Sequence, residues 1–154
     1  MNHRPEIDGL RAVAVLPVIL YHAGFEIFSG GFVGVDVFFV LSGYLITSII
    51  LDDLVRGRFS VTRFLERRAR RLLPALLSVL AVSAVFALLW LPPRHLIGFG
   101  TSVLSVLGFV SNFYFWKTVD YFGTTPDYLP LIHTWSLAVE EQFYIVFPLF
   151  MAGL

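Results

Sequence analysis

Long apolar stretches separated by short polar segments constrain this sequence more than any other feature. Each is about as long as the roughly 20 residues that a helix needs to cross a lipid bilayer. Complete stretches run from Gly9 to about Phe28, Gly30 to Leu51, Leu72 to Leu91 and Leu96 to Trp116, and another begins near Leu137 and is still apolar at Leu154. The pattern predicts an all-α, polytopic transmembrane helix bundle with four to five spans.

The composition supports the membrane class and excludes several others. Apolar residues make up 57% of the 154 residues and charged residues 14%, whereas soluble domains have about 45–50% and about 25%. This excess excludes a soluble globular enzyme, a disordered tail and a nucleic-acid-binding arm. The absence of cysteine excludes a disulfide, a zinc–thiolate site and a thiol nucleophile, and no metal site is predicted. Because the last apolar stretch is cut short, we expect residues 1–154 to be the N-terminal part of one longer transmembrane domain.

Arginines are concentrated in the segment Asp52–Arg71, which holds seven of them against three acidic residues. Short loops rich in Lys and Arg stay in the cytoplasm. Two spans precede this segment, so the N-terminus is also predicted to be cytoplasmic. A complete fourth span would place Lys117–Pro130 inside, although that segment has one Lys and two Asp. The glycines of Leu96–Trp116 leave open the alternative that this stretch is re-entrant.

Two ionisable residues of the first stretch, Arg11 and His22, are predicted to share one helix face. Their spacing corresponds to about 1100° of rotation, roughly 20° from complete turns, and to about 16.5 Å along the axis. Charged groups within a span usually face a cavity or a partner. In one interpretation Arg11 reaches the inner interface and His22 caps the outer helix end. In the other, His22 is a base or proton relay, because imidazole takes up and releases protons near neutral pH.

The second stretch carries one early charge, Asp36, among glycines at positions 30, 31, 34 and 43. Small residues allow helices to approach closely. Asp36 could pair with Arg11 or orient His22. The alternative is a packing face with one satisfied carboxylate, and the sequence leaves both open.

A cluster of arginines stands just before the third apolar stretch. Arg67 and Arg71 are one helical turn apart, as are Arg68 and Arg71. Such clusters mostly set topology and contact anionic lipid. The functional interpretation is a phosphate clamp, because the guanidinium fork grips a phosphate at two points.

The most informative stretch runs from His133 to Tyr144 and reads His-Thr-Trp-Ser-Leu-Ala-Val-Glu-Glu-Gln-Phe-Tyr. On a helix, His133 and Glu140 share a face, and so do Glu140 and Tyr144. Two adjacent carboxylates entering a span are costly, and a place near a helix N-terminus offsets only part of that cost. A purely structural role would not need both Glu140 and Glu141.

Four motifs in order along the chain resemble the membrane-bound acyltransferase family 3, whose members O-acetylate bacterial surface polysaccharides. The likeness covers essentially the whole chain, and four such motifs in order make it specific. The motifs are Asp8–Ala12 with Tyr21-His22, Gly34–Ile46, Arg67–Pro74, and His133–Pro148. The third resembles the family's Arg-x-x-Arg motif, with Arg68 and Arg71 the best-placed pair. The resemblance implies a domain of about ten transmembrane helices, of which this chain has the first half.

The resemblance also implies an O-acyltransferase of the bacterial inner membrane. Its donor would be cytoplasmic acetyl-CoA or another acyl-CoA, and its acceptor a hydroxyl of a surface carbohydrate such as lipopolysaccharide O-antigen, exopolysaccharide or peptidoglycan. His22 would remove the proton from the acceptor hydroxyl or pass the acyl group across. Arg11 would lie nearer the thioester. Donor phosphates would be bound by Arg67, Arg68 and Arg71, and the relay would be oriented or completed by Asp36, Glu140 and His133.

Two other classes of function stay open on the sequence. One is a transporter or proton-conducting half, because intramembrane His, Asp and Glu also build relays. The other is a non-catalytic membrane assembly subunit, in which Arg11 and His22 should be freely replaceable. The arginine cluster favours the acyltransferase. The expected partners are the bilayer, the acyl donor, the acceptor and the C-terminal half of the domain, without nucleic acid, and we expect this portion alone to be inactive.

Overall fold

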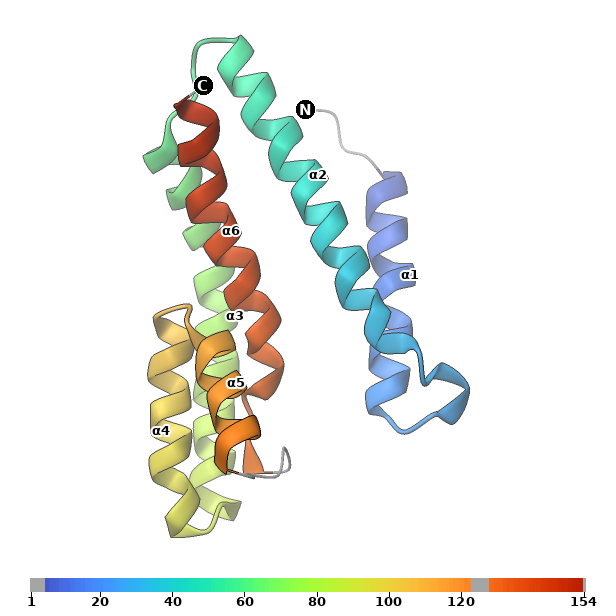
Figure 1. Ribbon diagram of the computed structural model, residues 1–154, viewed down its shortest axis with the longest axis vertical. Helices are drawn as coiled ribbons and strands as arrows, with labels where there is room; N and C mark the ends of the chain where they lie inside the picture. The colour runs from blue at the N-terminus through green and yellow to red at the C-terminus, as the bar shows by residue number, and fades with distance from the viewer. Residues whose placement is uncertain (1–4, 123–127, 154) are drawn as a thin grey trace. The chain divides into compact units, whose positions relative to one another are not determined.

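The computed structural model describes residues 5–122 and 128–153, apart from the side chains of residues 120–122 (Figure 1). Within these residues the chain is helical and has no strand, which confirms the predicted all-α class. The chain divides into two compact units, Met1–Phe59 and Ser60–Leu154, and each is described by itself.

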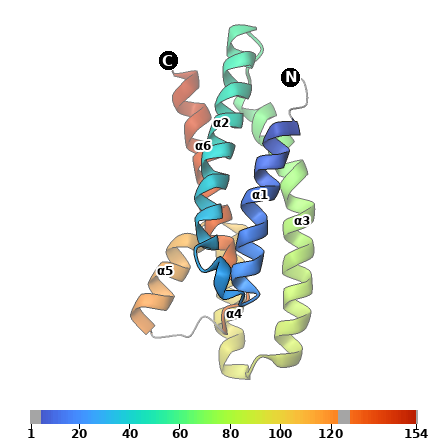
Figure 2. The ribbon, with the colours of Figure 1, turned by 90° about the vertical axis from the view of Figure 1, so that its right-hand side faces the viewer.

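The first unit is a hairpin of two helices, α1 (Pro5–His22) and α2 (Gly34–Val55), which lie side by side in Figure 2. Two 3-10 turns connect them, η1 (Glu26–Phe28) and η2 (Gly31–Val33). A Cβ on Gly34 would overlap the carbonyl oxygen of Ala14, and one on Gly31 would overlap that of Pro17. The glycines therefore permit the close approach that the sequence predicted.

The first helix ends at His22 rather than near Phe28, where the apolar stretch ends. Gly24 has a φ of +83°, a left-handed conformation that glycine adopts without steric cost. Its N–H donates to the Tyr21 carbonyl at 3.0 Å, and the N–H of Phe25 donates to that of Leu20 at 3.1 Å. These two bonds form a Schellman motif, which satisfies the last carbonyls of α1 and stops the helix there.

The second unit contains α3 (Val61–Trp90), α4 (Pro93–Leu107), α5 (Ser111–Phe122), the 3-10 turn η4 (Ile132–Thr134) and α6 (Trp135–Ala152). Most of the segment Asp52–Arg71, which was predicted to be a loop, is helical. α2 continues to Val55, and α3 begins at Val61 because the Ser60 side chain accepts the N–H of Arg63 as an N-cap. The arginine cluster therefore lies on the first turns of α3.

The described residues do not confirm four to five membrane-spanning helices. Two helical segments there are long and apolar enough to cross a bilayer, Gly31–Val55 and Val61–Trp90. α1 and α6 have 18 residues each and carry charged side chains within that length. The predicted span count and the ten-helix domain are not confirmed.

The fourth apolar stretch, Leu96–Trp116, is not one helix. Gly108 ends α4, and Phe109 has a φ of +52°, a conformation that breaks the helix before α5 begins. α5 turns back against α4, and the hydroxyl of Tyr114 donates to the carbonyl of Gly98 at 2.9 Å (Figure 1). A continuous fourth span is thereby excluded, and the stretch is a helical hairpin.

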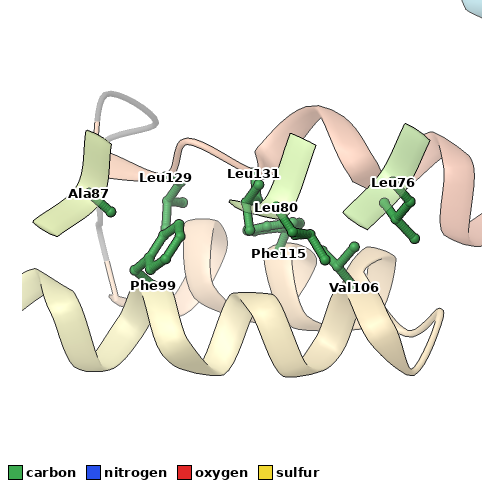
Figure 3. Close-up of a cluster of buried hydrophobic side chains, with 8 residues drawn as sticks. All are labelled: Leu76, Leu80, Ala87, Phe99, Val106, Phe115, Leu129 and Leu131. Atoms are coloured by element: carbon green, nitrogen blue, oxygen red, sulfur yellow. The ribbon is translucent and has the colours of Figure 1, made fainter. Parts of the chain in front are cut away.

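A cluster of buried apolar side chains holds this hairpin against α3, as Figure 3 shows. All helices of the hairpin and the segment before α6 contribute to it. Because lipid is as apolar as leucine, close packing rather than release of water stabilises such contacts in a membrane. The cluster consists of Leu76, Leu80, Ala87, Phe99, Val106, Phe115, Leu129 and Leu131.

Candidate functional site

His22 is the last residue of α1, and its ring is exposed. Its Nδ1 lies 2.8 Å from the carbonyl oxygen of Val18, one turn earlier. A carbonyl oxygen only accepts, so in the neutral ring this contact assigns the proton to Nδ1 and leaves Nε2 with a lone pair. The bond caps the helix end, as one interpretation expected, and it also leaves Nε2 able to accept a proton.

Arg11 lies on the same continuous helix as His22, with Pro17 between them, as the spacing predicted. The residue is partly buried. Its Nε is buried and has no hydrogen-bond partner among the residues that the structure describes. Such a buried donor is rare in folded proteins, where buried N–H groups almost always find an acceptor.

Asp36 stands in the first turn of α2 and is exposed. In the described part of the chain it makes neither the ion pair with Arg11 nor the hydrogen bond with His22 that the sequence left open. Its position at a helix N-terminus suits a carboxylate, because the helix dipole favours negative charge there. In the part of the chain that the structure describes, Asp36 therefore contacts neither Arg11 nor His22 through a hydrogen bond or an ion pair.

Arg68 is the arginine that α3 directs toward α6. Its Nη2 contacts a carboxylate oxygen of Glu141 at 3.1 Å, across 73 positions of sequence. Its guanidinium also lies over the ring of Tyr144, 3.4 Å from the centroid. The Nε of Arg68 is buried and lacks a hydrogen-bond partner within residues 5–122 and 128–153. Arg68 therefore joins two helices and still has an unused donor.

The other arginines of the cluster are placed differently. Arg67 and Arg71 are exposed on α3, and Arg70 pairs with Glu66 one turn earlier at 2.7 Å. Both exposed guanidinium groups are accessible to a ligand, whereas Arg68 is partly covered. The pair Arg68 and Arg71, predicted as the best-placed phosphate clamp, thus combines one fixed side chain with one accessible side chain.

α6 carries the remaining polar side chains of this unit. The hydroxyl of Tyr144 donates to the carboxylate of Glu140, so these residues share a face as predicted. Tyr144 is almost completely buried and Glu141 is buried, whereas Glu140 is half-buried. The two adjacent carboxylates have different partners, which accounts for the presence of both.

Gln142 follows Glu141 in the sequence and forms hydrogen bonds with the residues at the break between α4 and α5. Its Nε2 donates to the carbonyl of Phe109 at 2.7 Å and to Oδ1 of Asn112 at 3.0 Å. Asn112 returns a bond to Oε1 of Gln142 at 3.3 Å. Non-helical backbone at membrane depth must be satisfied by protein, and Gln142 does this for Phe109.

His133 lies in η4, two residues before α6 begins, and its side chain is exposed. Its carbonyl accepts the hydroxyl of Ser136 at 3.2 Å. His133 and Glu140 do not stand on one continuous α-helix, because His133 belongs to η4, which turns more tightly than an α-helix. His133 therefore precedes the helix that carries Glu140, Glu141 and Tyr144.

Sequence reasoning missed three residues of this site, Glu141, Gln142 and Tyr144, as candidates. All three belong to the signature that was recognised as informative. A carboxylate opposite an arginine cluster was a usable signal for Glu141. The partner of Gln142 is a backbone carbonyl at a helix break, which side-chain patterns do not reveal.

The candidate site residues fall into two groups, one in each unit. The first unit supplies an imidazole with a free Nε2 and an arginine with an unused buried donor. The second supplies guanidinium groups suited to phosphate, supported by Glu141 and Tyr144. In the first unit Nε2 of His22 can act as a base, and in the second unit the arginines have the geometry that binds phosphate.

Comparisons with known proteins agree with this chemistry. The model of a family described as an acyltransferase domain matches residues 4–154. The O-acetyltransferase OatA of Staphylococcus aureus strain NCTC 8325 / PS 47 is 43% identical over 150 residues, which are 96% of this chain and 24% of the relative. A protein of strain MSSA476, provisionally named as an O-acetyltransferase, is 45% identical over 158 residues, which are 100% of this chain and 26% of that protein.

The chain spans about a quarter of the length of these curated relatives. No solved structure matches it. The family match nevertheless covers almost every residue, including the helices that carry His22, Arg68 and Glu141. The chain therefore belongs to the acyltransferase domain family.

Proposed function

We propose that the protein containing this chain is a membrane O-acyltransferase. It moves an acyl group, acetyl in the first instance, from cytoplasmic acyl-CoA to a hydroxyl of a cell-surface carbohydrate. Family membership and the O-acetyltransferase names of the relatives support the reaction type. The apolar helices α2 and α3 support a place in the membrane. Activity is a property of the complete protein, and we expect residues 1–154 alone to be inactive.

The observation that carries this proposal concerns buried arginine donors. Among the described residues, the buried side-chain nitrogens without a hydrogen-bond partner are Nε of Arg11 and Nε of Arg68. Both belong to arginines that the family resemblance assigns to the acyl donor. An unpaired buried donor costs about 1–3 kcal/mol. A phosphate or carbonyl oxygen of a ligand would recover that energy at either position.

On the donor side, Arg67, Arg68 and Arg71 bind the phosphates of acyl-CoA. Arg71 and Arg67 are exposed and can close on the phosphates, while Glu141 and Tyr144 hold Arg68 in a fixed orientation. Arginine suits this task because its planar fork makes two parallel bonds to one phosphate. Bacterial inner membrane, with the arginines and the N-terminus in the cytoplasm, is the location that fits this donor.

On the acceptor side, His22 is the general base. Its Nε2 takes the proton of the acceptor hydroxyl as the hydroxyl oxygen attacks the acyl carbonyl carbon. The new C–O bond forms, the C–S bond of the thioester breaks, and CoA leaves as the thiolate. The bond from Nδ1 to Val18 keeps the tautomer that this step requires. Arg11, on the same helix, would lie near the thioester, and Asp36, Glu140 and His133 would act in orientation or relay.

The proposal is tested by acyl transfer in the complete protein. Membranes with wild-type protein, given acetyl-CoA labelled in the acetyl group, should transfer the label to polysaccharide. His22→Gln should reduce the rate by about 10²–10⁴, the usual contribution of a general base. Glutamine keeps hydrogen-bonding capacity and cannot take the proton.

The matched control is His95→Gln, the same replacement at a histidine near the start of α4 that has no assigned role. It should retain wild-type transfer. If His22→Gln stays within about threefold of wild type, the base is elsewhere. Freely replaceable Arg11 and His22 would instead indicate a non-catalytic subunit, and absent label transfer in wild type would refute the acyltransferase.

A further inference from the structure

We propose that α4 and α5 form a re-entrant hairpin that enters and leaves the membrane on the side opposite to Arg68. The tip of the hairpin, residues 108–112 at the junction of the two helices, is hydrogen-bonded to Gln142, the residue after Glu141. This inference concerns the path of the chain through the membrane and does not depend on the proposed enzymatic activity.

The path of the chain at the far end of α3 supports entry from that side. α3 is a candidate span whose first turns carry the arginines, so its end at Trp90 reaches the opposite side. α4 starts at Pro93, directly after this end. With 15 residues, α4 is about 22 Å long, which is too short for a hydrocarbon core of about 30 Å.

The return of the chain to the same side rests on contacts at the other end of the hairpin. The ring of Tyr128, which follows α5, stacks on the ring of His95 near the start of α4, with centroids 4.3 Å apart. Tyr128 and Pro130 also line one hollow together with Trp90 and Leu91 at the end of α3. The chain has therefore come back to the end from which α4 departed.

The tip of the hairpin lies against α6 and is satisfied there. Gln142 donates to the Phe109 carbonyl and exchanges bonds with Asn112. The hydroxyl of Ser111 donates to the carbonyl of Thr134 at 3.0 Å, and both residues are buried. Backbone that breaks inside a membrane is tolerated only where protein covers it, and these bonds provide that cover.

The tip and the arginine meet at neighbouring residues of α6. Glu141 contacts Arg68, while Gln142 contacts the tip. The hairpin and Arg68 therefore contact adjacent residues of α6.

The charge of the following segment agrees with this path. Lys117–Pro130 has one Lys and two Asp, which is unusual for a short cytoplasmic loop. In the proposed hairpin the described residues after α5, Tyr128 and Pro130, lie on the same side as Pro93, opposite to the arginines. A continuous fourth span would instead place this segment in the cytoplasm, although short cytoplasmic loops are usually rich in Lys and Arg.

Cysteine labelling tests the path directly, because the chain has no cysteine of its own. Arg58→Cys, Arg94→Cys and Pro130→Cys each introduce one thiol at an exposed position. In sealed cells, an impermeant maleimide should label the variants at 94 and 130 from one side and the variant at 58 only from the other. Labelling at 130 from the side of 58, or from neither side, would overturn the proposal.

A cross-link tests the hold of Gln142 on the tip. The hydroxyl oxygens of Ser111 and Thr134 are 3.3 Å apart, so Ser111→Cys with Thr134→Cys should oxidise to a disulfide. Adding Gln142→Leu should lower the yield at least about fivefold, which corresponds to about 1 kcal/mol for a lost hydrogen bond. An unchanged yield, with normal insertion, would show that Gln142 does not hold the tip.

Discussion

The guanidinium of Arg68 lies over the ring of Tyr144, 3.4 Å from its centroid, while one of its terminal nitrogens contacts Glu141. Both partners stand on one face of α6, three positions apart. A cation over an aromatic ring is worth about 2 kcal/mol or more when water is excluded. Arg68 is therefore oriented by the fold, and in the proposed function this would reduce the ordering cost of binding the donor.

Replacing Arg68 or Arg71 with Lys keeps the charge and removes the bidentate fork. We expect the apparent KM for acyl-CoA to rise about tenfold in the complete protein, which corresponds to about 1.4 kcal/mol. Membrane insertion should remain normal. Steady-state kinetics with varied donor measures this. An unchanged donor KM in both variants would mean that Arg68 and Arg71 set the membrane topology and do not bind the donor.

Glu141→Gln should lower the stability of the second unit, because Arg68 keeps its charge and loses the carboxylate. The side chains of Arg68 and Glu141 are 27% and 10% exposed, so we expect about 1–3 kcal/mol rather than the larger cost of a fully buried pair. Thermal unfolding in detergent measures the change. Glu66→Gln is the matched control, since its pair with Arg70 is exposed and should contribute little. Equal effects of the two variants would contradict the assigned role of Glu141.

His133 is the competing histidine of the site. It stands before α6, and the structure shows its carbonyl in a hydrogen bond with Ser136. We expect His133→Ala to reduce acyl transfer less than His22→Ala, with both measured by the same transfer assay at equal expression. An inactive His133→Ala beside an active His22→Ala would mean that the two histidines have exchanged roles.

Gly34→Ala should destabilise the first unit, because the added Cβ would overlap the backbone of Ala14. Overpacking of this kind costs about 1–3 kcal/mol. Gly43→Ala is the control on the same helix, where a Cβ meets nothing within 4 Å, and alanine is the better helix former there. Thermal unfolding of the two variants should separate them clearly. Equal stability would mean that α1 and α2 do not approach as closely as described.

A single cysteine at Ser60 reports the orientation of the chain. Ser60 lies between α2 and the arginine-rich start of α3. Because arginines keep short segments in the cytoplasm, Ser60→Cys should be labelled only after the membrane is opened. Labelling by an impermeant reagent added outside intact cells would reverse the predicted topology. Thr62→Cys, two positions later, serves as the internal duplicate.

Helical class and the close contact of α1 with α2 were predictable from the sequence. Apolar length predicts helices, and glycines at 31 and 34 predict a narrow crossing, since both effects are local. The spacing of Glu140 and Tyr144 predicted a shared face for the same reason. Their hydrogen bond confirms it.

Features that depend on distant residues were not predictable. The length of Leu96–Trp116 suggested a span, but the break at Phe109 is stabilised by Gln142, which stands 33 positions away. The pair Arg68–Glu141 likewise needs α3 and α6 to be antiparallel neighbours, which no local pattern indicates. The roles of His22, Arg11, Asp36 and the arginines in acyl transfer stay predictions.

The Phe109 carbonyl has a consequence for how the protein is made. When α4 and α5 leave the ribosome, Gln142 has not yet emerged from it, and a bare carbonyl in hydrocarbon costs several kcal/mol. We therefore expect the hairpin to stay at the membrane surface until α6 emerges and Gln142 can donate to the Phe109 carbonyl. We expect insertion of this region to follow a fixed order, in which α6 supplies the donor that lets the two short helices made before it enter the membrane.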